Sequence, residues 1–538
     1  MKTISNKSIV FFLLLYFFIL LIPAYNLPLF KTTEARYAEI AREMIVTGNY
    51  LEPQFEGVKH FHKPPLAYWV MAVGIKLFGT NGFGVRFFGV VAAVFSVFFV
   101  YKTAGLFFKE KQDCFLTSLV LASSLLFLVV SRIIATDIYL VFFTIAAQYF
   151  LFKQIFYEKS VFNASIYGIL LGLGFITKGP VIFLFTILPY LAGKIFFKSH
   201  RQNFTLKEIA YSLLLFLIVS LPWYIAVILK NPDLLYYFLK VQTVDRVATD
   251  RFDRSKDFYY FFLVFLISFF PHVIYFIKSL INFKKMDSFI KPLFLYILVP
   301  FVVFQISVSK LATYILPFYG TASIIAYYGY KKFNSKILNS VIVFVSLVLP
   351  LALGASSYFY DPLYIFRYYT ICFAIVLLIP LYFMFVHVKN YTKFLKSTAL
   401  FFIILSAFLY FFVPDIESNS KEYKQISHKL NSIDPERNIQ TLLYRTSKPA
   451  ISFYRNKLAV TALGNDRYLG FQQSNEYKKY YFTDENQISE FVSNNKIFFL
   501  VTRPRDYQHF KNKYGTECSK VIEQRKYSAY QCTGAKSK

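Results

Sequence analysis

Side chains that can perform acid–base or anion-binding chemistry are concentrated in the stretch TTEARYAEIAREM. It follows directly after an apolar run long enough to cross a bilayer. Tyr37, Ile40, Ala41 and Met44 recur at i, i+3, i+4 and i+7, which predicts a helix with one apolar face. Glu34 would lie in the first turn, where a carboxylate suits the positive end of the helix dipole. Taken alone, the pattern also fits a solvated interfacial helix whose charges form only surface ion pairs.

A second group of reactive side chains follows in GVKHFHKPPLAYW. His60, His62 and Lys63 stand beside a rigid Pro-Pro corner and next to aromatic residues typical of the membrane interface. Carboxylate, guanidinium, imidazole and ammonium groups at headgroup depth can bind a phosphate and stabilise the charge of a leaving group. The two stretches together favour an anion-binding site on one long loop.

Further ionisable residues interrupt apolar runs in the middle of the chain. Asp137 stands in RIIATDIYLVFF, Lys178 in GFITKGPVIF, and Lys310 and Tyr314 in SVSKLATYILP. A charge inside a membrane span costs about 2.5–3.5 kcal/mol on insertion scales, so such residues are functional by default. A lysine near the end of a span can also snorkel to the interface for structural reasons alone. Their expected position on one membrane face favours a shared site, to which Arg246 of another long loop would contribute.

The composition indicates the class of protein that positions these residues. Of 538 residues, 56% are hydrophobic and 21% are aromatic, which is typical of a membrane protein. Thirteen apolar segments suit membrane spans: 9–27, 84–108, 114–131, 133–155, 162–176, 178–196, 208–229, 258–282, 289–308, 311–330, 337–357, 364–387 and 395–413. The apolar segment 65–80 is shorter and follows two prolines, so we expect a helix at the outer interface.

The chain becomes polar from Asp415 onward, with helix-like and strand-like patches in alternation. We therefore predict a membrane domain over 1–414 and a soluble α/β domain over 415–538. Helices are expected in KEYKQISHKL and QISEFVSNN. Strands are expected in IQTLLYR, LAVTAL and KIFFLVT, and in a basic tail made of strands.

The net charge of +29 is explained largely by topology, without a nucleic-acid partner. With thirteen spans, five basic loops fall on one side, as the positive-inside rule predicts for the cytoplasm: 109–111, 198–207, 278–285, 331–336 and 388–396. The odd number of spans places the C-terminal domain outside, together with two long loops over 28–83 and 230–257. Loops of this length between packed spans are more often functional than idle.

The first apolar run and the cysteines bear on the compartment. No A-x-A cleavage site follows residues 9–27, which favours an uncleaved first span over a signal peptide. Cys114 and Cys372 fall in spans and suit small buried hydrophobes. Cys518 and Cys532 fall in the outside domain, where an oxidising compartment permits a disulfide without requiring one.

Several motifs occur together in a fixed order: TEARYAEIAREM, GNY, PQFEGVKHFHKPPLAYW, LFGTNGFGVR, TDIYL and TKGP. In these motifs the chain resembles the polyprenyl-phosphate-sugar glycosyltransferases of the membrane-embedded GT-C class. It is most similar to the bacterial lipid A 4-amino-4-deoxy-L-arabinose transferases, which are relatives of the protein O-mannosyltransferases. PWY and SKLATYILP extend the likeness over roughly residues 10–330.

The resemblance implies an all-α polytopic membrane protein of the GT-C type with about thirteen transmembrane helices. Juxtamembrane helices in the first periplasmic loop and a C-terminal soluble α/β domain complete this fold. The implied reaction is an inverting transfer of a sugar from undecaprenyl phosphate to lipid A at the periplasmic face of the bacterial inner membrane. The sugar is left open, and an amino sugar other than aminoarabinose, such as galactosamine, is one alternative.

Two other functions stay open at this stage. A related transferase could glycosylate a protein or another envelope glycan. A flippase or transporter of the lipid-linked sugar shares the polytopic architecture and the intramembrane charges. That reading predicts inverted repeats and charges near the midplane, whereas the polar residues here cluster at one face.

The resemblance also implies roles for individual residues. Glu34 takes the second position of the family's acidic pair, and the first position, usually Asp, is Thr33 in this chain. Glu34 and Asp137 are the implied catalytic carboxylates, and Lys63 matches a lysine that binds the lipid phosphate. The implied substrate-binding residues are Arg36, Tyr37, His62, Lys63, Lys178, Arg246, Lys310 and Tyr314.

A divalent cation stays an open alternative. Where relatives of the arabinose type have Glu before the lysine, this chain has His62, and where they have Glu-His in the second long loop, it has Gln242 and Thr243. A metal bound by such a Glu and His could not be bound in the same way here. His60 and His62 could replace those ligands, or the site could lack a metal.

Overall fold

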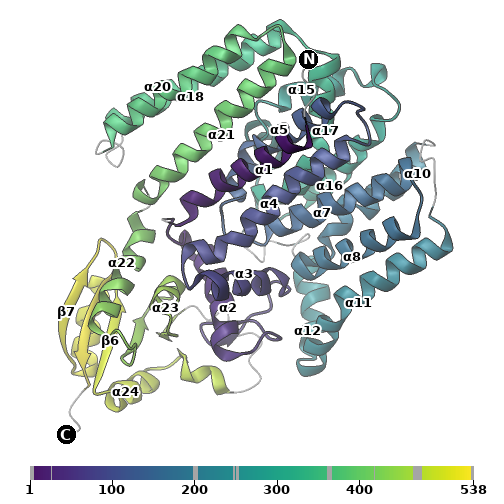
Figure 1. Ribbon diagram of the computed structural model, residues 1–538. Coiled ribbons are helices and arrows are strands. Elements are labelled where there is room, and N and C mark those ends of the chain that lie inside the picture. The colour runs from purple at the N-terminus through teal and green to yellow at the C-terminus, as the bar shows by residue number, and fades with distance from the viewer. Residues whose placement is uncertain are drawn as a thin grey trace. The chain divides into compact units, whose positions relative to one another are not determined.

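The computed structural model describes residues 5–25, 27–197, 204–245, 249, 254–359, 366–416, 418–464 and 475–534 (Figure 1). The chain packs into two compact units. One comprises Met1–Pro23 with Gly89–Phe411, and the other comprises Ala24–Phe88 with Phe412–Lys538. These two units are defined by packing. The domains 1–414 and 415–538 were predicted from composition, and the boundary at residue 414 stays a prediction.

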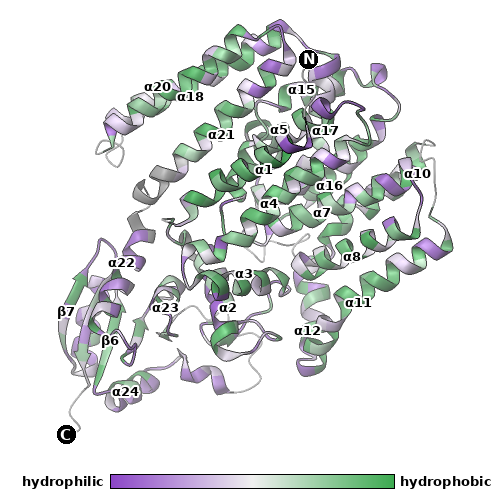
Figure 2. Cartoon of the chain, in the orientation of Figure 1, coloured by the Kyte–Doolittle hydropathy of each residue, from purple (hydrophilic) through white to green (hydrophobic). Residues whose placement is uncertain are grey.

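The first unit is built from apolar helices, in which hydrophobic residues dominate (Figure 2). Its helices are α1 (Asn6–Leu21), α4 (Gly82–Ala104), α5 (Lys111–Ala122), α6 (Leu125–Val130), α7 (Asp137–Phe152), α8 (Val161–Lys178), α9 (Ile182–Phe185), α10 (Ile187–Phe196), α11 (Leu206–Lys230), α12 (Asp233–Tyr236), α14 (Tyr260–Ser268), α15 (Val273–Ile281), α16 (Leu295–Ile306), α17 (Tyr319–Lys332), α18 (Lys336–Phe359), α20 (Arg367–Val386) and α21 (Tyr391–Ile416). Within the described ranges, eight helices are long and apolar enough to cross a membrane, or nine if one bent pair forms a single span. The polytopic all-α class is confirmed, and the count of thirteen spans stays a prediction.

Several expected spans are interrupted. The segment 114–131 forms α5 and α6, with a break at Ser123 and Ser124, whose hydroxyls bond the carbonyls of Leu119 and Val120. Serine hydroxyls that bond the carbonyl four residues back bend helices. The segment 258–282 forms α14 and α15, which are inclined by 115°. An apolar run therefore predicted the presence of helix here but not its continuity.

Small residues allow close packing between α8 and α11. A Cβ atom added at Gly168 would lie 2.1 Å from the Ser212 carbonyl oxygen, and one at Gly172 would lie 2.8 Å from the Val219 Cβ. Glycines four residues apart let two membrane helices approach backbone to backbone. This packing fixes the helix that ends at Lys178.

The two helices expected in the first long loop are confirmed as α2 (Lys31–Thr47) and α3 (Leu66–Phe78). The predicted apolar face of α2 is buried. The alternative of a solvated face opposite it is wrong, because Glu39, Arg42 and Glu43 are each at most 1% exposed. Their burial comes from packing between α2 and other parts of the second unit, which periodicity does not reveal.

The C-terminal part of the second unit contains the expected α/β fold. Its six strands lie in the order β5-β4-β3-β6-β8-β7, of which β5, β4, β3 and β6 are parallel and the β6-β8-β7 pairs are antiparallel. The strands are β3 (Gln440–Tyr444), β4 (Val460–Ala462), β5 (Tyr481–Phe482), β6 (Ile497–Thr502), β7 (Glu517–Glu523) and β8 (Ser528–Thr533). The helices are α22 (Ser418–Ile433), α23 (Pro449–Arg455), α24 (Glu485–Asn494) and α25 (Pro504–Tyr514).

Alternation along the strands produces two cores. Phe498 and Leu500 of β6 face α24 and α25, while Phe499 and Val501 face α22 and α23. Successive side chains of a strand point to opposite faces, so a buried parallel strand is apolar throughout. The result is a three-layer α/β/α arrangement.

The expected tail of strands after β6 is partly wrong, because it begins with helix α25. Pro504 occupies the first helical position, Asp506 lies in the first turn and Gly515 closes the helix with φ of 59°. These are standard signals of helix start and stop. The remaining strands β7 and β8 are paired, and a disulfide joins Cys518 to Cys532, which resolves the pairing that the sequence left open.

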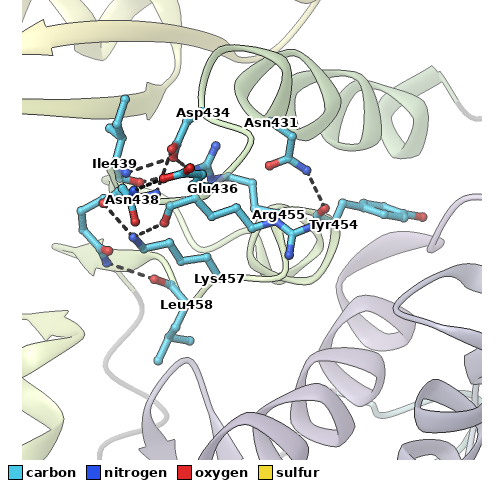
Figure 3. A network of polar contacts seen from close by, with 11 residues as sticks. Asn431, Asp434, Glu436, Asn438, Ile439, Tyr454, Arg455, Lys457 and Leu458 are labelled. Atoms are coloured by element: carbon cyan, nitrogen blue, oxygen red, sulfur yellow. Dashed lines mark hydrogen bonds and ion pairs between the residues drawn. The ribbon is translucent and has the colours of Figure 1, made fainter.

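A buried polar network ties α22, β3 and α23 together (Figure 3). Asp434 accepts hydrogen bonds from the amides of Asn438 and Ile439 and from the Arg455 guanidinium at 2.9 Å. Burial raises the pKa of Asp434, but these three hydrogen bonds outweigh it and hold the pKa below its usual value. The adjacent Tyr454 hydroxyl accepts a hydrogen bond from the Leu29 amide at 2.9 Å, which joins the first loop to this layer.

Candidate active site

The first unit brings Asp137 and Lys178 into an ion pair. The Lys178 Nζ lies 2.8 Å from the Asp137 Oδ1, with side-chain exposures of 9% and 15%. Asp137 begins α7 and Lys178 ends α8, so each charge complements the dipole of its own helix. The two antiparallel helices thus present a positive and a negative group at the same level.

The chain turns sharply after Lys178. Gly179 has φ of 77° and nothing within 4 Å of the position a Cβ would take, so its role is the backbone conformation. Pro180 then starts a short 3₁₀ turn, Gly179–Val181. The TKGP motif therefore ends one helix with its lysine directed away from the turn toward Asp137.

A cavity of about 250 Å³ lies beside this pair. Leu140, Pro180, Val181, Leu184, Val303 and Phe304 form most of its wall, and the polar residues are Lys178, Gln242, Thr243, Ser307 and Tyr314. Apolar walls with a few polar groups are typical of a site for an organic ligand. The Lys178 ammonium is the only charged side chain among the described lining residues, so the cavity favours an anionic group.

Tyr314 and Lys310 take different positions. The Tyr314 ring lies 5.2 Å from the Lys178 Nζ, within the range of a cation–π contact. The buried Lys310 donates from Nζ to the Lys256 carbonyl at 3.2 Å and from its amide to the Arg254 carbonyl at 3.0 Å. Lys310 therefore holds the second long loop, while Tyr314 faces the cavity.

Arg246 lies outside the described residues, and the structure shows another arginine of the same loop. The Arg254 Nη1 lies 3.5 Å from the Tyr314 hydroxyl. Arg254 was not predicted from the sequence, because no motif includes it and its contact joins residues 60 positions apart. The only sequence feature that could have pointed to Arg254 is the run of ionisable residues in DRFDRSKDF.

The second unit places Glu34 in a buried ion pair. Its Oε2 lies 2.8 Å from the Arg86 Nη2, and the two side chains are 3% and 1% exposed. Glu34 also accepts the Phe30 amide at 2.7 Å, while Arg86 donates to the carbonyls of Leu27 and Pro28. These bonds fix the start of α2 against the start of α4, whereas Thr33 is exposed.

A separate cationic group forms around His60. The imidazole rings of His60 and His62 lie 4.1 Å apart, and the charges of His62, Arg36 and Lys63 act on His60. Burial, followed by these positive charges, holds the pKa of His60 well below its usual value, so the imidazole is neutral at neutral pH. Tyr37 packs with its ring 5.7 Å from Tyr68. Arg36, His60, His62 and Lys63 are thus brought together, whereas Glu34 pairs with Arg86.

Three buried glutamates were not identified as a group from the sequence. Glu39 forms a two-bond ion pair with Arg42, at 2.6 and 2.8 Å. Glu43 accepts the amides of Glu56 and Gly57, at 2.6 and 3.0 Å. Burial, with the nearby charge of Glu39, raises the pKa of Glu43 to about 8, although Arg42 and the two amides oppose the shift.

Glu56 continues this group toward the C-terminal layer. Its Oε2 accepts a hydrogen bond from the Ser447 hydroxyl at 2.7 Å. Burial raises the pKa of Glu56 to about 7 against this hydrogen bond. Such shifts also mark structural clusters, so they do not by themselves identify a catalytic acid.

The described side chains do not form a site for a bound divalent cation. Within the described residues, no three His, Cys, Asp or Glu side chains are grouped so that they could hold a metal ion. Gln242 bonds the Tyr237 hydroxyl at 2.5 Å and Thr243 bonds the Phe238 carbonyl at 2.8 Å, and both are neutral. His60 and His62 supply two ligands, one fewer than the three protein ligands of catalytic zinc sites.

Comparison with known proteins points to one group. The sequence model of the dolichyl-phosphate-mannose-protein mannosyltransferase family matches residues 7–238. Undecaprenyl phosphate-alpha-4-amino-4-deoxy-L-arabinose arabinosyl transferase 2 of Proteus mirabilis is 31% identical over 341 residues, which are 61% of this chain and 60% of that protein. The transferase of Aeromonas hydrophila is 30% identical over 320 residues, 56% of each chain. The chain thus spans about 60% or less of the length of these curated relatives.

The fold matches over nearly its whole length. The crystal structure of ArnT from Cupriavidus metallidurans bound to undecaprenyl phosphate covers 98% of both chains with a TM-score of 0.80 and 17% identity. The apo structure of the same protein gives a TM-score of 0.81 and 18% identity. The fold is therefore that of ArnT. In sequence the chain is similar, over 56–61% of its length, to the curated aminoarabinose transferases, which confirms the resemblance seen in the sequence motifs.

Proposed function

We propose that the protein is an inverting glycosyltransferase that moves a sugar from undecaprenyl phosphate to lipid A at the periplasmic face of the bacterial inner membrane. The amino sugar of the curated relatives, or a close analogue, is the proposed sugar. The observation that carries this proposal is the Asp137–Lys178 pair beside an apolar cavity, in a fold shared with a protein crystallised with undecaprenyl phosphate.

The proposed step exchanges one C–O bond for another. An oxygen of a lipid A phosphate attacks the anomeric carbon, and the bond from that carbon to the carrier phosphate breaks on the opposite face. The electron pair stays on the phosphate of the released undecaprenyl phosphate. An acceptor phosphate is already anionic and requires little general-base catalysis, so Thr33 in place of an aspartate is compatible with this acceptor.

Lys178 stabilises the negative charge that develops on the leaving phosphate. An ammonium in a cavity with apolar walls is more effective there than in water, because fewer competing dipoles screen it. Asp137 orients Lys178 at 2.8 Å and provides a carboxylate for the oxocarbenium-like centre. The Tyr314 ring makes a cation–π contact with the Lys178 ammonium.

The proposal retains the other residues that the resemblance implies. Arg36, Tyr37, His62 and Lys63 in the second unit, and Arg246 and Lys310 of the first, are proposed to bind the substrates. Glu34 is proposed as the second catalytic carboxylate. Its buried ion pair with Arg86 supports a role in which its position is fixed before substrate binds.

The test is transfer by matched variants. We expect Lys178→Gln and Asp137→Asn to lower the rate of transfer by about 100-fold or more, as loss of a charge-stabilising donor does in other enzymes. Lys194→Gln removes the same charge from an exposed position on α10 and should retain full activity. Mass spectrometry of lipid A from cells that express each variant measures the added sugar. Full activity of Lys178→Gln would refute the site, and an unchanged lipid A with sugar on a protein or another glycan would refute the acceptor.

A further inference from the structure

The C-terminal sheet has a topological switch point between β3 and β6. The chain leaves β3 through α23 to reach β4 on one side, and it returns through α24 to β6 on the other side. Connections that leave neighbouring parallel strands in opposite directions create a crevice outside the carboxyl ends of those strands, where ligands bind in open α/β sheets. Topology therefore identifies one edge of this domain as a binding position.

Cationic and hydroxyl side chains converge at that edge. Thr446 and Lys448 follow β3, Arg503 follows β6, and Tyr527 precedes β8, whose first residue Ser528 pairs with Thr502 at the end of β6. The Thr446 hydroxyl donates to the Tyr527 hydroxyl at 3.4 Å. These residues lie far apart in the sequence and are brought together by the sheet.

Lys448 is held between two aromatic rings. Its Nζ lies 4.9 Å from the Tyr527 ring and 5.4 Å from the Tyr423 ring of α22, and these rings lie 5.8 Å apart. Cation–π contacts orient an ammonium group without neutralising its charge. Lys448 is therefore positioned and still able to bind an anion.

The pKa of Tyr527 reflects the positive charge at this edge of the sheet. Burial raises the pKa of Tyr527, but hydrogen bonds from Thr446 and Arg503 and the charge of Lys448 outweigh it and lower the pKa below its usual value. Two nearby acids act on these cations through their charges. Asp506, which lies 3.8 Å from Arg445, acts on Arg503, and Glu56, which accepts the Ser447 hydroxyl, acts on Lys448. Across the described part of the chain, no carboxylate forms an ion pair with Lys448 or Arg503.

We propose that Thr446, Lys448 and Arg503, arranged around Tyr527 at the switch point, form a binding site for a phosphate group. The Lys448 ammonium, the Arg503 guanidinium and the Tyr527 hydroxyl provide the point charge, the planar fork and the short donor that bind phosphate oxygens. Thr446 donates to the Tyr527 oxygen, which leaves the Tyr527 proton for the phosphate. The ligand is a phosphate monoester on a lipid headgroup or free phosphate, which share this chemistry. This site goes beyond the transfer reaction and does not depend on it.

Binding by the full chain in detergent tests the site. All variants carry Lys178→Gln, which removes the cation of the membrane cavity and makes transfer activity irrelevant to the measurement. Binding of a probe at the other proposed substrate residues is the same in parent and site variant, so the difference between the two reports the new site alone. Isothermal titration calorimetry then measures the affinity for inorganic phosphate, for lipid A with its phosphates and for dephosphorylated lipid A. The site variant combines Lys448→Gln and Arg503→Gln.

We expect the site variant to bind the phosphate-bearing probes at least tenfold more weakly, as the loss of two charge-assisted hydrogen bonds predicts. The control combines Lys429→Gln and Lys511→Gln, which remove the same charge from exposed positions of the same domain, and should change affinity less than about twofold, as for distant charges in salt. A Lys448→Arg and Arg503→Lys exchange keeps the charge and should retain most of the binding.

The three probes distinguish the source of the phosphate. Tighter binding of phosphorylated lipid A than of either other probe, lost in the site variant, identifies a lipid headgroup. Equal binding of inorganic phosphate and phosphorylated lipid A identifies free phosphate. Affinities that are the same in the site variant, the control and the parent chain for every probe would overturn the proposal.

Discussion

At the scale of single residues, the ion pairs show which candidates the sequence could define completely. Asp137 and Lys178 were both predicted, and the structure pairs them at 2.8 Å. Glu34 was predicted without its partner, because Arg86 lies 52 positions away in the sequence. A charge inside an apolar context identifies a candidate residue, whereas the partner that sets its function depends on tertiary packing. Arg254 escaped prediction for the same reason.

The Glu34–Arg86 pair predicts a large effect on stability. Glu34→Gln leaves a buried guanidinium without its carboxylate, and breaking a buried pair in this way costs about 3–5 kcal/mol. We expect a clearly lower midpoint of thermal unfolding for the purified chain in detergent. Glu52→Gln disrupts the more exposed pair of Glu52 with Lys59, whose side chains are 11% and 25% exposed, and should cost at most about 1 kcal/mol. Equal midpoints for the two variants would contradict the structural role of Glu34.

The titration of Glu43 predicts that the stability of the second unit depends on pH. Its pKa is about 8 in the folded chain against the ordinary 4.5, so the folded state retains a proton that the unfolded state has lost. Below pH 4.5 both states are protonated. Between pH 4.5 and 8 the free energy of unfolding decreases as pH rises, by about 1.4 kcal/mol for each pH unit, and above 8 the loss is complete.

Glu43→Gln removes this titration, so its unfolding midpoint should change less between pH 5 and 8.5 than that of the parent chain. Thermal unfolding at several pH values measures the difference. Glu485→Gln is the control, because Glu485 pairs with Lys513, and that hydrogen bond lowers its pKa out of this window. A parent chain whose midpoint is flat from pH 5 to 8.5 would show that Glu43 is not protonated in the folded state.

At the scale of elements, periodicity predicted most helices and strands but not their breaks. Helix α2 and the strands β3, β4 and β6 fall where the patterns placed them. The bend of 115° between α14 and α15 was missed, because an apolar run has the same composition whether the helix continues or turns. The buried acids of α2 were missed because a helix surrounded by protein has no solvated face to produce the usual pattern.

The hairpin of β1 (Gln54–Phe55) and β2 (Val58–Lys59) gives a prediction at this scale. Its turn residue Gly57 has φ of 74°, and an added Cβ would lie 2.6 Å from the Tyr480 ring. Gly57→Ala therefore meets both backbone strain and a steric clash. Gly48 has a similar φ of 72° with nothing within 4 Å, so Gly48→Ala meets the strain alone.

We expect Gly48→Ala to lower the free energy of unfolding by about 1 kcal/mol. Gly57→Ala should lower it by about 1–3 kcal/mol more, the usual cost of overpacking. Thermal or denaturant unfolding of both variants compares them directly. Equal losses would mean that Tyr480 moves aside without cost, and that the hairpin is not tightly packed against the strand layer.

At the scale of the whole molecule, two distant stretches of chain form one unit. The composition predicted a polar C-terminal domain, and the structure packs it with the first long loop. Glu56 bonds Ser447, and the Leu29 amide bonds the Tyr454 hydroxyl. These contacts join residues 391 and 425 positions apart, so no local pattern could reveal them. The C-terminal domain therefore has a direct mechanical link to the loop that holds His62 and Lys63.

This link predicts the result of truncation before α22. Without the C-terminal layer, the carboxylate of Glu56 loses the Ser447 hydroxyl and Gly57 loses its packing against Tyr480, while the helices of the first unit keep their own contacts. A segment with fewer buried contacts has a lower free energy of local unfolding, so the hairpin of β1 and β2 should unfold locally more often in the truncated chain. We expect faster trypsin cleavage after Lys59, with the fragments identified by mass spectrometry.

Cleavage after Lys284 and Lys285 provides the internal control, because these lysines follow α15 in the first unit. Ser447→Ala in the full chain should also accelerate cleavage after Lys59, by a smaller amount, since it removes one hydrogen bond worth about 1 kcal/mol. If truncation accelerates all sites equally, the chain has lost its fold. If it accelerates none, the first loop is stable by itself and the second unit is not cooperative.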